Sequence, residues 1–130
     1  MLIAAQSTND DTGSKEYVSG QFIRLSYQKF SELRQELARF EGFELREMKG
    51  YMGDKSWDEV ETALKPILSG ADDNTTLTPM ECFAVYPRLE HVMGRLRAGG
   101  GVSDAILDIG DRIVGVMKAC AQNGWEMVFS

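Results

Sequence analysis

One stretch of the sequence has the residue types and spacing of a cation-binding loop. The twelve residues from Gly70 to Glu81 separate two segments with helical hydrophobic spacing, which is the size and setting of an EF-hand loop. Gly70 brings no carboxylate to position 1, and Thr75 stands at position 6, where glycine normally makes the sharp turn. With these two departures from the EF-hand pattern, the loop is expected to bind calcium weakly at most. In this register the candidate oxygen ligands are Asp72, Asn74, Thr76 and Glu81.

The same loop has an explanation that needs no metal. Asp72, Asp73 and Asn74 are common turn residues. Thr78 and Glu81 match a capping box, with proline at the first helical position between them. We therefore favour a structural loop that resembles a calcium module, with calcium kept as the alternative ligand and no other cofactor expected.

Residues that could assemble a catalytic centre are sparse. His91 is the only histidine, and Cys82 and Cys120 lie in apolar helical stretches without a CxxC partner. No nucleophile, base and orienting group can be combined from these types. The sequence predicts a protein that is not an enzyme and that works in a reducing compartment.

Charge points instead to a protein partner. Residues 51–86 hold seven acidic and two basic residues, so this segment carries −5 of the net charge of −6. Nucleic acid binding is disfavoured because it needs clustered Lys and Arg, whereas a basic protein surface suits the segment. We expect an adaptor, inhibitor or immunity-type protein that binds through this acidic face. The candidate partner-binding residues are Trp57, Asp58, Glu61 and Asp73.

Tyr51, Met52 and Trp57 each have two possible roles, in the binding surface or in the core. Tyr51 and Met52 lie close to Trp57 in the sequence and could extend the binding surface, because aromatic residues and methionine are enriched at interface centres. A domain of this size also needs most of its aromatic side chains inside. Core packing is therefore the favoured explanation for all three.

Hydrophobic spacing and capping signals predict a mainly helical fold. We expect a helix from Ser26 to Gly42, a helical turn around residues 45–52, a helix from the capping box at Ser56 to residue 68 that Pro66 ends or bends, and two further helices. The third begins at Pro79 and consists of two pieces that meet at a kink at Pro87. The last is capped by Ser103 or Asp104 and ends at Asn123 and Gly124. Residues 18–25 and 125–129 could pair as a two-stranded sheet joining the N- and C-terminal segments.

The chain length of 130 residues fits one core. We expect a disordered leader over residues 1–17 and a single compact helical domain over residues 18–130, which includes the EF-hand-like helix-loop-helix. The start has no signal-peptide pattern, and no apolar run is long enough to cross a bilayer. The cytoplasm is the expected location, without membrane contact.

Three runs of the sequence resemble a set of small, uncharacterised bacterial proteins. The runs are Met48-Lys-Gly-Tyr-Met-Gly-Asp-Lys-Ser-Trp-Asp-Glu, Leu77-Thr-Pro-Met-Glu-Cys-Phe-Ala-Val-Tyr-Pro-Arg-Leu and Ala119-Cys-Ala-Gln-Asn-Gly-Trp-Glu. These proteins share a Lys-Ser-Trp-Asp segment and an acidic loop before Thr-Pro-x-Glu-Cys, and the resemblance covers roughly residues 22 to 130. The resemblance implies domain boundaries but no activity.

Overall fold

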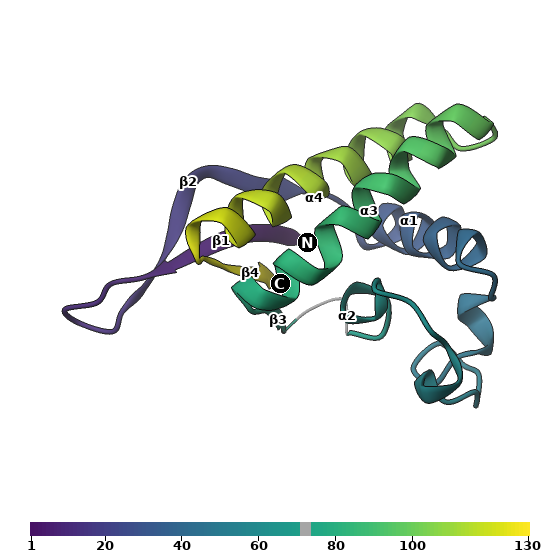
Figure 1. The fold of residues 1–130 in the computed structure, drawn as a ribbon, viewed down its shortest axis with the longest axis horizontal. Helices are drawn as coiled ribbons and strands as arrows, with labels where there is room; N and C mark the ends of the chain where they lie inside the picture. Colours follow the sequence, from purple (N-terminus) through teal and green to yellow (C-terminus); the bar gives the residue numbers. More distant parts are fainter. Residues whose placement is uncertain (71–73) are drawn as a thin grey trace.

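The chain folds around a four-stranded antiparallel sheet, so the expectation of a mainly helical fold was wrong. The structure, a computed structural model, describes residues 1–70 and 74–130. Within them the sheet has the strand order β2-β1-β4-β3 (Figure 1). The fold class is therefore α+β. The strands are β1 (Leu2–Thr8), β2 (Lys15–Arg24), β3 (Thr75–Leu77) and β4 (Glu126–Phe129).

Strand β1 occupies the segment that we expected to be a disordered leader. Ile3, Ala4 and Ala5 are all buried, and β1 pairs with β2 on one side and with β4 on the other. The C-terminal strand was expected correctly, but β1 separates it from β2, the strand predicted to pair with it. The brief apolar run of Ile3, Ala4 and Ala5 was too weak a sequence signal for a strand. The strands that stabilise β1 by pairing with it lie elsewhere in the chain.

Three of the predicted helices are confirmed at their first residues. Ser26, Thr78 and Ser103 are the N-caps of α1, α3 and α4, and the side chain of each accepts a hydrogen bond from a backbone amide in the first turn. Gly124, with φ of 69°, ends α4 in the left-handed conformation typical of a glycine cap. The helices are α1 (Tyr27–Phe40), α2 (Lys65–Leu68), α3 (Pro79–Gly99) and α4 (Asp104–Asn123), with 3-10 turns η1 (Leu45–Glu47) and η2 (Trp57–Glu59).

The predicted helix from Ser56 to residue 68 does not form. The capping box at Ser56 is present, but it starts only η2, and Pro66 lies at the start of α2 rather than at the end of a longer helix. The EF-hand-like pair of helices is therefore absent from the described fold, because α2 has four residues and β3 joins the sheet. The apolar residues expected on the inner face are nevertheless buried: Val60, Leu64, Ile67 and Leu68.

Helix α3 is continuous through Pro87, where we expected two helical pieces meeting at a kink. Proline cannot donate to the carbonyl of Phe83, four residues earlier. Both residues lie on the exposed side of the helix, where water can satisfy that carbonyl. The missing bond is therefore tolerated without ending the helix.

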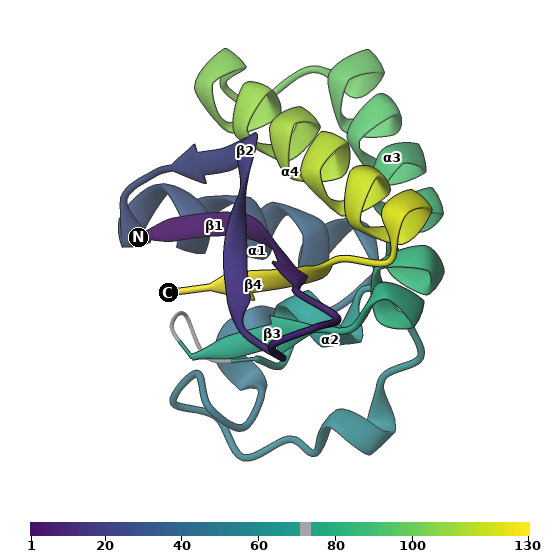
Figure 2. The same cartoon turned by 90° about the vertical axis from the view of Figure 1, so that its left-hand side faces the viewer.

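The core lies between one face of the sheet and the helices. Ile3 and Ile23 point into it from β1 and β2, and the ring of Phe129 on β4 packs 5.9 Å from that of Phe30 on α1. Helix α4 contacts β1, β2, α1 and α3, and Figure 2 shows the strands in front of α1 with the α3–α4 pair beside them. The other face of the sheet carries the alternate residues, among them Leu2, Ala4 and Phe22.

No helix within the described part of the chain combines the length and apolar character needed to cross a bilayer.

Candidate functional site

Residues 48–55 form a tight turn, called here the 48–55 turn, that is closed by several backbone hydrogen bonds. The amides of Tyr51 and Gly53 both donate to the carbonyl of Met48, at 3.0 and 3.3 Å. Lys49 and Lys55 are joined by a 3.0 Å backbone hydrogen bond, and the Lys55 amide donates to Glu47 at 3.0 Å. A Cβ added at Gly53 would lie 2.1 Å from the Glu47 backbone, so the chain closes here more tightly than any side chain allows.

Two aromatic side chains fix this turn to the core. The Tyr51 hydroxyl donates to the Leu68 carbonyl at 2.6 Å, and the Trp57 indole N–H donates to the Lys49 carbonyl at 3.0 Å. The Trp57 ring packs edge-on against Tyr51 and Phe43, with ring centroids 6.3 and 5.9 Å apart. Both half-buried residues therefore support the turn and pack against the core.

Met52 is the exception, because it gains nothing from the core. The Met52 side chain is fully exposed, and the backbone φ of Met52, 76°, is in the left-handed region. A non-glycine residue in that region costs about 1–2 kcal/mol. A large apolar side chain is therefore held in solvent, in an unfavourable backbone conformation, by a turn that is anchored on both sides.

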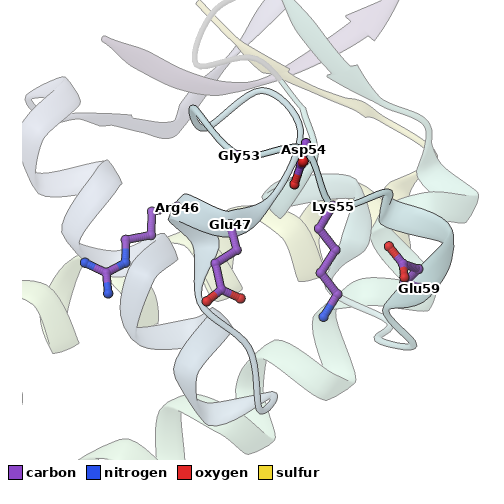
Figure 3. Close-up of a pocket in the computed structure, with 6 residues that line it drawn as sticks. All are labelled: Arg46, Glu47, Gly53, Asp54, Lys55 and Glu59. Atoms are coloured by element: carbon purple, nitrogen blue, oxygen red, sulfur yellow. The ribbon is translucent and has the colours of Figure 1, made fainter.

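Among the open depressions that adjoin the turn, two contain several of its residues. The one beside Met52 has a volume of about 460 Å³ and extends along the outer side of α1. Its lining is Ser31, Gln35, Arg39, Glu44, Leu45, Arg46, Tyr51 and Met52. The second, of about 700 Å³, is drawn in Figure 3, where Lys55 extends between the carboxylates of Glu47 and Glu59. Its lining is Arg46, Glu47, Gly53, Asp54, Lys55 and Glu59, and it contains no histidine, cysteine or serine.

The exposed carboxylates that follow the turn form what we call the acidic row: Asp58, Glu59 and Glu61. No basic residue stands between Lys55 and Lys65 in the sequence, and Lys55 itself lies beside Glu59 in the larger depression. The Glu59 carboxylate accepts the Ser56 amide at 3.2 Å and stays at the surface. Two of the predicted partner-binding residues, Asp58 and Glu61, are thus exposed together, whereas Asp73 lies outside the described residues.

The residues proposed for calcium are only partly described. Asp72 lies outside the described residues, Asn74 has a left-handed φ of 57°, and Thr76 belongs to β3. The Glu81 carboxylate accepts the Thr78 amide at 3.0 Å as part of the capping box. Among the described residues, no three His, Cys, Asp or Glu side chains are grouped so that they could hold a metal ion. Calcium binding stays a prediction.

Arg34 on α1 is a charged side chain that is almost fully buried. Only 2 % of Arg34 is exposed, and its guanidinium lies 4.5 Å from the ring centroid of Phe30 and 5.1 Å from that of Tyr51. One of its nitrogens donates to the carbonyl of Gly70 at 3.1 Å. Burial lowers the pKa of Arg34 and raises that of Tyr51. Arg34 therefore ties α1 to the start of the acidic loop.

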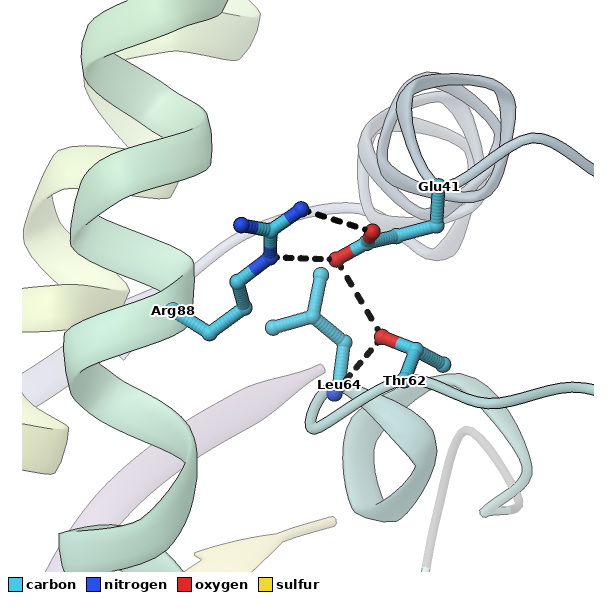
Figure 4. Close-up of polar contacts among 4 residues, drawn as sticks. All are labelled: Glu41, Thr62, Leu64 and Arg88. Atoms are coloured by element: carbon cyan, nitrogen blue, oxygen red, sulfur yellow. Dashed lines mark hydrogen bonds and ion pairs between the residues drawn. The ribbon is translucent and has the colours of Figure 1, made fainter.

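An ion pair joins the end of α1 to α3, and the sequence analysis did not predict it. Arg88 donates two hydrogen bonds to the carboxylate of Glu41, and the Thr62 hydroxyl donates a third at 3.2 Å (Figure 4). The Thr62 oxygen also accepts the Leu64 amide at 3.0 Å. The segment between η2 and α2 is thereby held against both helices. Charge patterning along each helix gave no signal for this pair, because its members are 47 positions apart.

The cysteines are packed side chains, as expected. Cys82 on α3 and Cys120 on α4 are both 0 % exposed. A hydrogen bond shared with Cys120, together with burial, raises the pKa of Cys82. Although Cys82 lies in the first turn of α3, its burial keeps the thiol away from solvent.

Comparison of the chain with family models, with curated proteins and with solved structures finds no match. The resemblance to small bacterial proteins therefore stays a prediction.

Proposed function

We propose that this chain is a non-enzymatic protein-binding module and that its binding surface combines Met52 with the acidic row. The exposed, left-handed Met52 supports this most strongly. Backbone conformations of this kind persist when the surrounding structure enforces them, and they cluster at binding sites. An unbranched, polarizable methionine adapts well to a partner surface.

The acidic row supplies the second part of the binding surface. Asp58 and Glu61 are exposed on the segment that follows the turn, and neither forms an ion pair among the described residues. Charges of one sign attract a partner of opposite charge and raise the association rate. The partner is accordingly a protein with a basic surface next to an apolar contact for Met52.

The side chains around the turn favour binding over catalysis. Both thiols are buried, and the large depression is lined by charged side chains and a glycine. A wide, shallow surface with charged groups of both signs is suited to contact with another protein. We therefore assign the depressions to the rim of an interface with an adaptor, inhibitor or immunity-type role.

Affinity capture from extracts of the producing cells, followed by measurement of affinity for the recovered protein, tests this proposal. Met52→Ala should weaken the complex by about thirtyfold or more, because truncating a hot-spot side chain costs about 2 kcal/mol or more. Glu61→Lys should slow association, most strongly at low salt. Asp108→Lys, which makes the same charge change at an exposed position of α4, is the matched control. Equal affinity of wild type, Met52→Ala and Glu61→Lys for every captured protein would refute the proposed surface.

A further inference from the structure

A second exposed surface lies on the face of the sheet opposite the core. Cross-strand pairing puts Phe22 beside Ala4 and Arg24 beside Leu2, with all four side chains on the outer face. The pairing then skips to Tyr17 opposite Gln6, so residues 18–21 form a bulge that includes Gly20 at φ of 77°. An open groove lies between the bulge and the paired residues of β1 and β2.

This groove is apolar and has one cationic end. Ala4, 1 % exposed, forms its floor, while Tyr17 and Phe22 are 58 % and 51 % exposed at its sides. Its volume is about 200 Å³. A cavity of roughly 150 Å³ accommodates a benzene ring, so the groove has room for one aromatic or branched side chain. The lining is Leu2, Ala4, Tyr17, Val18, Phe22 and Arg24.

The charge of this face identifies the kind of ligand. Lys15 is neutralised by Glu126 at 2.8 Å, but no ion pair within the described chain reaches Arg24. The Arg24 guanidinium lies 6.0 Å from the ring centroid of Phe22, directly beside the apolar groove. A ligand that fills the groove with an apolar side chain therefore meets Arg24 with its neighbouring residue. A carboxylate at that place gains a charge-assisted hydrogen bond.

We propose that this groove binds an extended acidic segment of a second protein, in which one large apolar residue is flanked by Asp or Glu. Strand β2 is one of the two edge strands of the described sheet, with β1 as its only neighbour, so an extended chain can reach the groove from the open side. This inference is independent of the proposed function, since it uses none of the residues of the 48–55 turn or the acidic row. In Figure 1, β2 and the 48–55 turn lie toward opposite ends of the long axis. The two surfaces could therefore hold two partners at once.

Three capped pentapeptides test the proposal by NMR titration of the full chain: Gly-Asp-Phe-Asp-Gly, Gly-Asp-Ala-Asp-Gly and Gly-Lys-Phe-Lys-Gly. The first should shift the backbone resonances of Leu2, Val18 and Phe22. The other two should bind about tenfold more weakly, a difference of about 1.4 kcal/mol. Arg24→Glu should reverse the preference toward the lysine peptide. Arg112→Glu, the same change at an exposed position of α4, should leave it unaltered.

Several outcomes would overturn the proposal. Equal affinities for the three peptides would show that neither the apolar side chain nor the charge is recognised. Shifts confined to other parts of the chain, or no shifts at millimolar peptide, would place no ligand in the groove. Shifts of the groove residues that depend on protein concentration without peptide would identify a second copy of this chain as the occupant.

Discussion

Arg88 and Glu41 form a two-pronged ion pair across 47 positions of the sequence, with Nε donating to Oε1 at 2.8 Å and Nη2 donating to Oε2 at 2.9 Å. The hydrogen bonds from Arg88 hold the pKa of Glu41 below its usual range. Glu41 is the C-cap of α1, and Thr62 links the same carboxylate to the segment before α2. The pair therefore stabilises the region that supports the candidate site.

The first prediction concerns acid stability. Because the pKa of Glu41 is lower in the folded state, its contribution to the free energy of unfolding is complete above the unfolded-state pKa, about 4.3. That contribution is lost as the pH falls through the folded-state pKa. Glu41→Gln should be less stable than wild type at neutral pH, and the difference should shrink under acid. Chemical denaturation at a series of pH values measures this difference in the free energy of unfolding, and Glu90→Gln on α3 is the control. A difference that does not change with pH would contradict this role.

The second prediction concerns the tightness of the 48–55 turn. Gly53→Ala places a Cβ 2.1 Å from the Glu47 backbone, which cannot move without opening the turn. We expect a loss of about 1–3 kcal/mol. The same substitution at Gly94, in α3 with no atom near its Cβ, should instead stabilise by up to about 1 kcal/mol. Thermal melts of both variants check the opposite signs. An unchanged melt for Gly53→Ala would mean that the turn is loose.

The sequence predicted those parts of the fold whose signals are local. Capping residues and periodic apolar positions located the starts of α1, α3 and α4, because each depends on neighbours within one or two turns. The size of the sheet was underestimated because strand pairing depends on residues that are far apart in the sequence. Residues 2–8 are stable as a strand only between β2 and β4, and β3 is three residues inside a segment that had the spacing of a calcium loop.

The candidate site was predicted as a region but not in its details. The charge of residues 51–86 pointed to the acidic row, and Tyr51, Met52 and Trp57 were singled out together. Their different roles depend on hydrogen bonds to the carbonyls of Leu68 and Lys49, which no spacing encodes. The buried Arg34 was missed because it has a helical position typical of a surface charge.

The third prediction concerns the two thiols. Cys82 and Cys120 are fully buried, and the raised pKa of Cys82 disfavours its thiolate. In native protein at pH 8, Ellman's reagent should react only as fast as the chain opens. Both thiols should react at once in denaturant. A rapid reaction of one thiol in the native protein would show an accessible, functional cysteine.

The fourth prediction separates two roles of Glu81. As the partner of Thr78 in the capping box, Glu81 accepts one backbone hydrogen bond, so Glu81→Ala should cost about 0.5–1.5 kcal/mol, while Glu81→Gln keeps an oxygen that can accept the Thr78 amide. If capping is its only role, wild type should melt at the same temperature in chelator and in millimolar calcium. A ligand at 100 times its dissociation constant would add about 2.7 kcal/mol. A calcium-specific rise that Glu81→Gln abolishes would make Glu81 a metal ligand.

Site-specific photo-crosslinking is the most direct test of the proposed binding surface. A photo-crosslinking amino acid is placed at Met52 in one variant and at Lys118, exposed on α4, in another. In extracts of the producing cells, position 52 should give a discrete adduct with a protein that has a basic surface, and Glu61→Lys or added salt should weaken that adduct. Position 118 should not give this adduct. The same adducts from both positions, or none from position 52, would contradict a binding surface built on Met52 and the acidic row.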